Sequence, residues 1–398
     1  MIAAPKPLEA PASSSALMAI TSRPECVMVR GKGSYLWDSD GRQYLDFIQG
    51  WAVNALGHCP AELVSALSRQ ANLLISPSPA LHNAPQLELA DRLAEASGLA
   101  AVHFANSGAE ANEAAVKLAR KWGQLHKPGA TQIITTTGGF HGRTLAMMAA
   151  SGKPGWESMF PPAVPGFVKV PFGDADAVAA ARHDDTLAIM VEPIQGEAGV
   201  VVPPDDYLPA LRALADRHGL LLILDEVQTG IGRTGALFAH QHACVMPDIM
   251  TLGKGLGGGV PISALLASDA VSCFAFGDQG GTYNGNPLMT ATAVAVLDTV
   301  NRPAFLANVR QRGAQMASGL GDLSQHHGHL GARGQGLLQA LHLRAPRAAD
   351  VAAACFERGL LINAAQPDIV RLMPSLKVKE AEVDAALLTL GEVLARLG

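Results

Sequence analysis

The middle of the chain carries short, continuously apolar segments separated by stretches with helical periodicity, and this alternation constrains the fold most. A strand covered by helices on both faces is apolar throughout, whereas a strand with one wet face alternates apolar and polar residues. The helical stretches include Ala109–Trp122 and Tyr207–His218. The predicted strands are Val102–Ala105, Gln132–Thr136, Phe167–Val170, Leu187–Val191, Leu220–Leu224, Asp248–Leu252 and Ile262–Ala267. We therefore predict an α/β domain with a mainly parallel, seven-stranded sheet and with ligands at the carboxyl ends of its strands.

The two ends of the chain lack this alternation and predict a second, smaller unit. Residues Gly31–Gly50 combine glycine, aspartate and aromatic residues in a way that suits a small sheet. After Asn301 the pattern changes to amphipathic helices around a glycine-rich turn at Gly331–Gly336. A length of 398 residues also suggests two domains. We expect residues 1–60 and 301–398 to build one small α+β domain beside a large domain formed by residues 61–300.

Composition excludes several classes of function. The net charge of -5 leaves no basic excess for nucleic acid or for an anionic membrane surface. The 5 cysteines are scattered and His326, His327 and His329 lack ligand partners, so neither disulfides nor a metal site is indicated. The segment Met1–Pro24 is rich in alanine, proline and serine and lacks the pattern of a signal peptide. A cytoplasmic protein without a membrane span is expected.

Two polar residues follow predicted strands in positions suited to a planar ligand. Lys254 lies in the glycine-rich run Thr251–Gly259, where its amine could reach a carbonyl carbon and add to it. Taken alone, such a run more often indicates a flexible turn with a solvated lysine. Asp225 ends the apolar run Leu220–Leu224, so its buried carboxylate needs a partner. That partner could be a protonated pyridine nitrogen, as in pyridoxal phosphate, or the aspartate could cap a following helix.

A third segment has the properties of a phosphate site. Ser107, Gly108 and Ala109 join a predicted strand to a predicted helix. The free N–H groups and the positive dipole at a helix start favour a bound anion. Ser107 also fits an N-cap residue, with Glu110 completing a capping box, and the two roles are compatible.

A fourth segment, Gly138–Arg143, places an aromatic ring, an imidazole and a guanidinium on one glycine-bracketed turn. Phe140 could stack on a flat cofactor and Arg143 could bind a carboxylate. A packed aromatic residue beside a surface arginine explains the same residues about equally well. The four segments occur together in one α/β chain, however. In combination they indicate a phosphate cradle, a stacking ring, a pyridine partner and an amine.

With these residues assembled, the chain resembles the class III (ω-amino) aminotransferases of the fold-type I pyridoxal phosphate enzymes. Within that class it looks most like the branch that acts on N2-acetylornithine. The resemblance extends over nearly the whole chain, from about Gly31 to Leu390. It is carried by Trp37–Asp38, Tyr44–Phe47, Ala52–His58, Asn106–Asn112, Phe140–Thr144, Glu192–Glu197, Asp225–Gly230, Gly232–Gly235, Thr251–Gly255 and Gly285–Pro287.

The resemblance implies a cofactor site in which Lys254 and Asp225 are the catalytic residues. Lys254 would hold pyridoxal 5′-phosphate as a Schiff base, and Asp225 would pair with the pyridine nitrogen. The other cofactor-binding residues that the resemblance implies are Ser107, Gly108, Ala109, Phe140, His141, Val227, Gln228 and Thr282. In a homodimer with shared active sites, Thr282 would reach the phosphate bound by the other subunit.

The resemblance also implies transfer of the terminal amino group of N2-acetylornithine or a similar donor to 2-oxoglutarate, which gives a semialdehyde and glutamate. Arg143 would bind the α-carboxylate of the donor, and Arg371 that of 2-oxoglutarate. Glu197 would neutralise Arg371 while the donor is bound and move aside for the acceptor. Since one site must accept two differently charged substrates, a movable glutamate can change its charge between the two half-reactions.

The sequence departs from the family pattern around the donor. Leu81, His82 and Ala84 stand where relatives usually carry an aromatic residue, a tyrosine and a glutamate. Trp51, also expected to bind substrate, stands where relatives have isoleucine or tyrosine, and Gly281 replaces a serine or threonine. The alternative donors are therefore succinylornithine, ornithine and 4-aminobutyrate. Two further interpretations of the sequence remain. The protein could belong to the decarboxylase or aminomutase branches of the family, or it could bind pyridoxal phosphate without catalysis.

Overall fold

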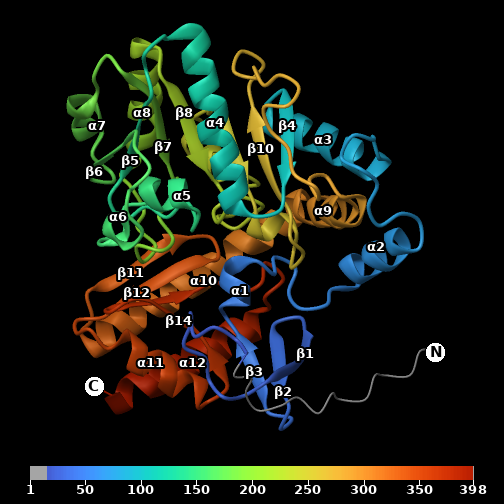
Figure 1. Cartoon of the computed structure of the whole chain (residues 1–398). Helices are drawn as coiled ribbons and strands as arrows, with labels where there is room; N and C mark the ends of the chain where they lie inside the picture. The colour runs from blue at the N-terminus through green and yellow to red at the C-terminus, as the bar shows by residue number, and fades with distance from the viewer. Residues whose placement is uncertain (1–15, 398) are drawn as a thin grey trace.

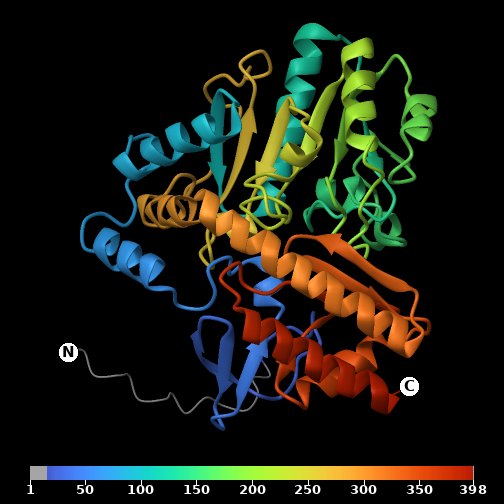
Figure 2. The same ribbon diagram turned by 180° about the vertical axis from the view of Figure 1, so that it is seen from behind.

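The computed structural model describes residues 16–397 and places them in two layers (Figures 1 and 2). The upper layer in Figure 1 holds the middle of the chain, and the lower layer holds both of its ends. The expectation for Met1–Pro24 falls mostly outside the described residues. The domain boundaries near residues 60 and 300 stay a prediction.

A seven-stranded sheet forms the centre of the upper layer. Its strands are β4 (Ala101–Ala105), β5 (Gln132–Thr136), β6 (Phe167–Val170), β7 (Thr186–Val191), β8 (Leu221–Asp225), β9 (Ile249–Leu252) and β10 (Ser263–Ala267). Their order across the sheet is β4-β10-β9-β8-β7-β5-β6, and β10 runs antiparallel to both of its neighbours. The other paired strands are parallel. The predicted mainly parallel sheet is thus confirmed.

Helices cover both faces of this sheet, which explains why most residues of its strands are apolar. On one face, α4 (Gly108–His126) packs on Leu221 and Ile223 of β8. On the other face, α8 (Tyr207–His218) packs on Leu222 and Leu224 of the same strand. Successive side chains of a strand point to opposite faces, so every residue of β8 must be apolar except the last.

The remaining helices are short or lie at the edges of the two layers. Helices α2, α3 and α9 pack together beside β4 and β10 (Figure 1). Their bounds are α2 (Ala61–Ala71), α3 (Ala84–Ser97) and α9 (Pro287–Val300). The others are α1 (Gln49–Ala52), α5 (Leu145–Ala150), α6 (Trp156–Met159), α7 (Ala175–Ala181), η1 (Ala239–Ala243) and η2 (Lys254–Leu256). No helix within residues 16–397 has the length and apolar composition needed to cross a membrane.

A small sheet in the lower layer joins the two ends of the chain. It consists of β1 (Met28–Lys32), β2 (Tyr35–Asp38), β3 (Gln43–Asp46) and β13 (Leu360–Leu361). Strand β13 pairs parallel with β3, with Leu360 opposite Leu45. This pairing confirms that a smaller α+β domain is built from both chain ends.

The glycine-rich turn predicted at Gly331–Gly336 is wrong for most of its length. Residues Gly331–Gln335 form strand β11, which pairs with β12 (Leu338–His342) in a second sheet. A Cβ on Gly334 would lie 2.2 Å from the Leu338 carbonyl oxygen, so glycine permits the close approach of the two strands. Only Gly336, with φ +56, forms the turn between them. Because β11 consists mainly of glycine and polar residues, its sequence does not predict a strand.

The second sheet and three helices complete the lower layer. The sheet order is β11-β12-β15-β14, with β14 (Asn363–Gln366) and β15 (Ile369–Leu372). The helices are α10 (Pro303–His327), α11 (Ala348–Phe356) and α12 (Glu380–Leu397). Strand β15 carries Arg371, and this strand lies against the carboxyl edge of the large sheet through contacts described below.

Because helices cover both faces of β8, truncation of one of its side chains should strongly destabilise the folded protein. Leu222 is fully buried, so Leu222→Ala should lower the free energy of unfolding by about 2–5 kcal/mol. Urea denaturation followed by circular dichroism measures this change. Leu125→Ala is the matched control, because Leu125 is 59% exposed at the end of α4 and should change stability little. An equal decrease in the free energy of unfolding for the two variants would contradict the packing of helices on both faces of β8.

Candidate active site

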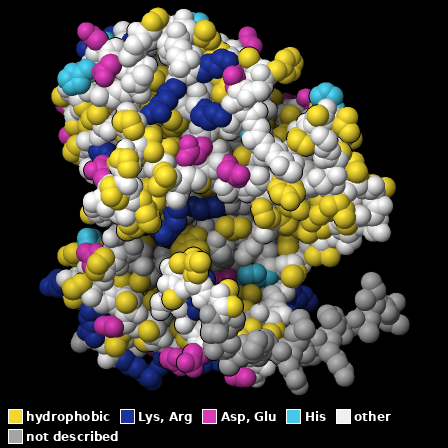
Figure 3. Space-filling model, in the orientation of Figure 1, with side chains coloured by type: hydrophobic (Ala, Val, Ile, Leu, Met, Phe, Trp, Pro, Cys, Tyr) yellow, Lys and Arg dark blue, Asp and Glu magenta, His cyan; other side chains and the backbone are white. Residues whose placement is uncertain are grey.

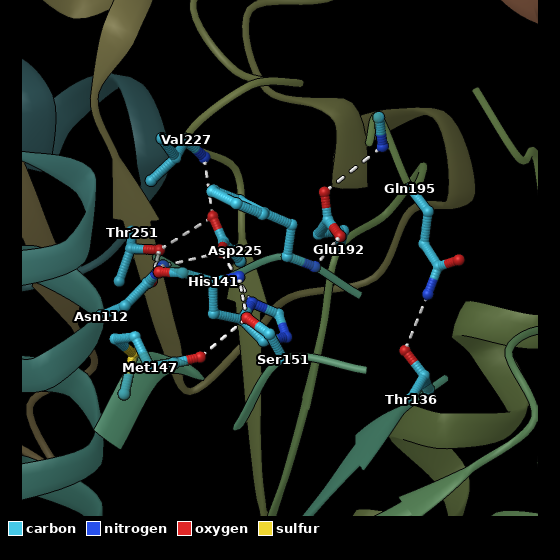
Figure 4. Close-up of polar contacts among 12 residues, drawn as sticks. Asn112, Thr136, His141, Met147, Ser151, Glu192, Gln195, Asp225, Val227 and Thr251 are labelled. Atoms are coloured by element: carbon cyan, nitrogen blue, oxygen red, sulfur yellow. Dashed lines mark hydrogen bonds and ion pairs between the residues drawn. The ribbon is translucent and has the colours of Figure 1, made fainter. Parts of the chain in front are cut away.

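The predicted site residues gather at the carboxyl edge of the large sheet. Asp225 ends β8, and Lys254 follows β9. Ser107 follows β4 and Phe140 follows β5. The carboxyl ends of parallel strands meet at one edge, so loops far apart in the sequence converge there. Figure 4 shows part of this convergence around Asp225.

The Asp225 carboxylate is buried and accepts hydrogen bonds from several parts of the chain (Figure 4). Its Oδ2 accepts from Asn112 Nδ2 at 2.7 Å and contacts His141 Nδ1 at 2.8 Å. Its Oδ1 accepts from the backbone N–H of Val227 at 3.0 Å. The Thr251 hydroxyl lies 3.5 Å from the same oxygen but donates to Asn112 Oδ1 at 2.6 Å, which orients the Asn112 amide. These contacts fix the carboxylate at the end of β8 and keep it aligned.

The His141 imidazole is fully buried beneath Asp225. Burial by itself lowers its pKa, but the hydrogen bond to Asp225 and the negative charges of Asp225 and Glu192 raise the pKa above its usual value. The backbone N–H of His141 donates to Ser151 Oγ at 2.9 Å, which fixes the turn. Its Nε2 has no hydrogen-bond partner among the described residues. A proton on Nδ1 is therefore shared with Asp225.

Glu192, which follows β7, is a buried carboxylate to which the sequence assigned no role. Its Oε1 accepts from the backbone N–H of Phe140 at 2.9 Å, and its Oε2 accepts from that of Gly196 at 3.3 Å. Desolvation is the main reason that its pKa rises to about 7, with the charge of Asp225 adding to the effect and that of His141 opposing it. Glu192 thus carries a proton over much of the acidic range.

The start of α4 has the predicted capping box. The backbone N–H of Glu110 donates to Ser107 Oγ at 3.3 Å, and that of Ser107 donates to the Glu110 carboxylate at 2.7 Å. Helix geometry supplies no acceptor for the N–H groups of Gly108 and Ala109. A Cβ on Gly108 would lie 2.7 Å from a methyl group of Val227, so this glycine allows close packing. The first turn of α4 thus retains free N–H groups.

Gly142 brings the turn Gly138–Arg143 against the start of α4. Its φ of +141 favours glycine, and an added Cβ would lie 2.7 Å from the Cβ of Ala109. The side chains of Phe140 and His141 are thereby placed beside the first helical turn. The sequence predicted both segments as parts of one site, and the structure brings them into contact.

Lys254 is the first residue of η2 and has an unusual backbone conformation, with φ +42. Non-glycine residues rarely adopt this region, and such strain is concentrated at functional sites. Burial lowers the pKa of its amine, while Glu197, Asp225 and Glu192 oppose the shift and Arg371 adds to it. Among the described residues the amine makes no hydrogen bond. It is thus held close to several charges but paired with none.

Arg371 and Glu197 form a buried ion pair between the two layers. Arg371 is completely buried on β15, and its Nη2 contacts Glu197 Oε1 at 2.8 Å. The same guanidinium donates to Asn363 Oδ1 at 2.8 and 3.1 Å and to the Gly196 carbonyl at 2.8 Å. Burial raises the pKa of Glu197, but the charges of Arg371, Lys254 and Lys153 hold it below its usual value.

Arg143 lies in a neighbouring group of cations and aromatic rings. Its guanidinium is 5.5 Å from the Trp156 ring, and the ammonium of Lys153 lies over the same ring at 5.3 Å. Phe140 packs edge-on against Trp156 with the ring centres 5.6 Å apart. Arg143 itself is exposed at the mouth of the site. It is therefore available to an incoming anion.

Gln228 is buried with neither atom of its amide hydrogen-bonded within the described residues. Buried amides without partners are costly, so such a group indicates a ligand or water at that position. A Cβ on Gly196 would lie 1.6 Å from Gln228 Oε1, so the amide packs directly on Gly196. Gln228 therefore lies beside the Arg371–Glu197 pair.

Two predicted residues, Thr282 and Trp51, are exposed. Thr282 lies in the loop before α9, and its side chain makes no hydrogen bond with the Ser107 turn within residues 16–397. Trp51 is 49% exposed, with φ +62 at the kink in α1. Asn284, close to Thr282 in sequence, does reach the site, since it accepts from Asn106 Nδ2 at 3.0 Å. The structure thus brings the loop near the site but not Thr282 itself.

Sequence reasoning missed three residues of the site: Asn112, Glu192 and Lys153. Asn112 lies four residues into α4, on the face that the helix period turns towards β8. Glu192 directly follows the fully apolar β7, which is the signal that identified Asp225 after β8. The same argument, applied to every strand end, would have found Glu192.

The chain belongs to the class III aminotransferases, since the model of that family matches residues 18–394. It is 54% identical to an acetylornithine aminotransferase of Bordetella bronchiseptica, over 96% of this chain and 97% of the relative. Its structure is similar to the N-acetylornithine aminotransferase of Stenotrophomonas maltophilia, with TM-score 0.82, 37% identity and coverage of 94% and 96%. It is also similar to the ornithine aminotransferase of Toxoplasma gondii, whose active site partly holds PLP, with TM-score 0.91, 33% identity and coverage of 96% and 92%.

The raised pKa of Glu192 predicts a pH-dependent contribution to stability. The folded state keeps a proton up to a pKa of about 7 that the unfolded state releases near 4.5. This stabilising contribution is complete below about pH 4.5 and is lost as the pH rises through about 7. Glu192→Gln removes the titration, so between about pH 5 and about pH 8 the variant should gain stability relative to the native chain, by an amount on the order of 3 kcal/mol.

Urea denaturation at the two pH values measures this difference. Glu357→Gln is the matched control, because the Glu357 side chain is 72% exposed and should leave the pH dependence unchanged. The same pH dependence in the native chain and in Glu192→Gln would mean that Glu192 ionises like a surface carboxylate, and would contradict the assignment.

Proposed function

We propose that this enzyme transfers the terminal amino group of N2-acetylornithine, or a similar ω-amine, to 2-oxoglutarate and forms a semialdehyde and glutamate. The observation that carries the proposal is the buried Arg371–Glu197 pair beside the amine of Lys254. An arginine covered by a glutamate can be neutral towards one substrate and cationic towards the next. The names of the similar proteins, acetylornithine and ornithine aminotransferases, support the same donor class.

The residues at the carboxyl edge fit pyridoxal 5′-phosphate. The free N–H groups at the first turn of α4, from Gly108 and Ala109, suit its phosphate. Gln228 has an unpartnered buried amide, which suits a ring hydroxyl. Phe140 and Val227 would cover the two faces of its flat ring. We therefore assign these residues, with Ser107 and His141, to cofactor binding.

Asp225 is the residue that would pair with the pyridine nitrogen. The ring supplies an electron sink when its nitrogen is protonated. Asn112 and the N–H of Val227 donate to the Asp225 carboxylate, and His141 Nδ1 contacts it, so the carboxylate is held in one orientation. Burial lowers the pKa of His141, but its hydrogen bond to Asp225 and the negative charges near it raise the pKa above its usual value. These contacts would hold Asp225 in place against the pyridine nitrogen.

Lys254 would hold the aldehyde carbon of the cofactor and carry the proton of the reaction. Burial lowers the pKa of its amine, so a larger share is unprotonated and able to act as nucleophile and base. The strained φ of +42 fixes the direction of its side chain. The same amine, when not bonded to the cofactor, would be placed to accept and return a proton at the substrate carbon.

The two arginines divide the substrate carboxylates between them. Arg143, exposed at the mouth of the site beside Trp156, would bind the α-carboxylate of the donor. Arg371 would bind the α-carboxylate of 2-oxoglutarate once Glu197 has left it. Asn363 and the Gly196 carbonyl hold the guanidinium in place during that exchange. Trp51 would line the donor side.

We further propose a homodimer in which Thr282 completes the phosphate site of the other subunit. Thr282 is exposed and lies beyond the site of its own chain. Large apolar side chains are exposed in the segments near it, which a second copy would cover. These are Leu73, Leu74, Ile75, Leu81 and Tyr283.

We also propose that the enzyme is cytoplasmic and that its domain boundaries lie near residues 60 and 300.

Removal of the amine tests the assignment of Lys254. In Lys254→Ala, cofactor should still bind, but borohydride should no longer attach it to the protein, and glutamate formation should fall at least about 10³-fold. Mass spectrometry after reduction and a glutamate assay give the two readouts. Lys379→Ala, on the surface, is the control and should behave like the native enzyme. Near-normal turnover in Lys254→Ala would contradict the assignment.

Comparison of donors tests the proposed reaction. Glutamate formed from 2-oxoglutarate should be measured with N2-acetylornithine, succinylornithine, ornithine and 4-aminobutyrate. We expect the highest kcat/KM for N2-acetylornithine, roughly tenfold above 4-aminobutyrate, which lacks the acylated α-amino group. Absence of glutamate with all four donors would contradict the proposal and favour the decarboxylase or aminomutase branches.

A further inference from the structure

Glu197 lies between two cations and is bonded to only one of them. Its Oε1 contacts Arg371 Nη2 at 2.8 Å, within hydrogen-bond distance. Its Oε2 faces Lys153 Nζ at 3.8 Å, which is too long for a hydrogen bond. A shift of about 1 Å would close the second contact. The carboxylate is therefore close to an alternative partner.

Lys153 is held in position with its hydrogen-bonding capacity unused. Its ammonium lies over the ring of Phe140 at 5.2 Å and over that of Trp156 at 5.3 Å. Within the part of the chain that the structure describes, this ammonium donates no hydrogen bond, and Glu197 is the one carboxylate in ion-pair range. Two aromatic rings thus orient a cation whose protons remain free.

The backbone around Glu197 is fixed, so only its side chain can move. The Gly196 carbonyl accepts from Arg371 Nη1 at 2.8 Å. The carbonyl of Glu197 accepts from Gln366 Nε2, also at 2.8 Å. With the main chain held on both sides, rotation of side-chain torsions decides where the carboxylate goes. Lys153 lies within that reach.

A cavity of about 630 Å³ adjoins this pair and provides the space for such a movement. Its lining includes Lys153, Gln366 and Ala198, the neighbour of Glu197. Lys169, Arg333, Glu157 and Asp368 also line it, and Lys169 is paired with Glu157. Lys153 is thus the lining cation in ion-pair range of Glu197. Figure 3 shows a hollow between the upper and lower parts of the molecule with Lys and Arg side chains on its walls.

We propose that Lys153 is a positioning residue that receives the Glu197 carboxylate when a carboxylate of the acceptor binds Arg371. The proposal rests on the proposed function and adds a residue to it. In this exchange Arg371 trades one carboxylate for another, while Asn363 and Gly196 keep it in place. Glu197 trades Arg371 for Lys153. Arg371 and Glu197 are each paired in both states, which avoids the cost of leaving either charge uncompensated.

The proposal predicts that loss of the Lys153 charge weakens acceptor binding through Glu197. Glutarate is a suitable probe, because it has the two carboxylates of the acceptor but no carbonyl to react. Its Kd for the holoenzyme, measured by calorimetry, should rise about tenfold in Lys153→Met. Lys153→Arg, which keeps the charge, should restore the Kd to within about threefold. In the half-reaction with 2-oxoglutarate, the KM should rise similarly and the maximal rate should change little.

Lys169→Met is the matched control for the effect of removing any positive charge from the cavity. Lys169 lines the same cavity but pairs with Glu157 rather than with Glu197. Its loss should leave the Kd of glutarate within about threefold of the native value. An equal loss of affinity in Lys169→Met and Lys153→Met would overturn the proposal in favour of a general electrostatic effect.

A double-mutant cycle separates action through Glu197 from direct binding of the acceptor by Lys153. In Glu197→Gln the side chain is neutral and needs no cation when it leaves Arg371. Adding Lys153→Met to that variant should therefore not change the Kd. A further tenfold loss there would mean that Lys153 contacts the acceptor itself, and an unchanged Kd in the single variant Lys153→Met would mean that it has no role; either result overturns the proposal.

Failure of the proposed function has a different signature. A native holoenzyme that neither binds glutarate nor forms glutamate from 2-oxoglutarate would show that Arg371 is no acceptor site. That outcome overturns both the function and the role of Lys153. Glutarate binding that is insensitive to Lys153→Met overturns the role of Lys153 alone.

Discussion

The buried carboxylate of Asp225, at the end of a strand covered on both faces, is the constraint on which the site depends. A charge at this position is stable only if donors satisfy it, and these come from α4, from the turn after β5 and from the backbone after β8. Each of these hydrogen bonds fixes a different segment of the chain next to the Asp225 carboxylate. The first turn of α4 and the turn that carries His141 are consequently held around one position. The hydrogen bonds that stabilise the Asp225 carboxylate therefore also set the arrangement of the candidate site.

A second set of charges links the chemistry to the arrangement of the two layers. Arg371 belongs to the small domain, whereas Glu197 and Lys153 belong to loops of the large sheet. The pairing between them is therefore also a contact between the layers, reinforced by the hydrogen bond from Gln366 to Glu197. In the proposed mechanism, exchange of carboxylates on Arg371 would change that contact in every catalytic cycle. Substrate discrimination and domain packing would then use the same residues.

The parts of the fold that depend on local pattern were predictable, and those that depend on close approach were not. The apolar runs identified all seven strands of the large sheet, and α8 has the predicted bounds Tyr207–His218. The capping box of Ser107 and Glu110 was also predictable, because it involves neighbours in sequence. Strand β11 was mistaken for a turn, since its glycines serve the approach of β12. Asn112 was missed because its partner lies far along the chain, whereas the strand-end argument was not applied to Glu192.

The sequence alone determined the fold class, the family resemblance and the candidate residues at the strand ends, because apolar periodicity and short motifs are local properties. Only the tertiary structure decided which of these residues touch. The partners His141 and Asp225 are 84 residues apart, and Asn112 and Asp225 are 113 apart, so no local pattern records their contact. The raised pKa of Glu192 and the position of Glu197 between Arg371 and Lys153 likewise arise from burial and distance. For Lys254, the sequence supplied the amine, and the assembled fold supplied the charges around it.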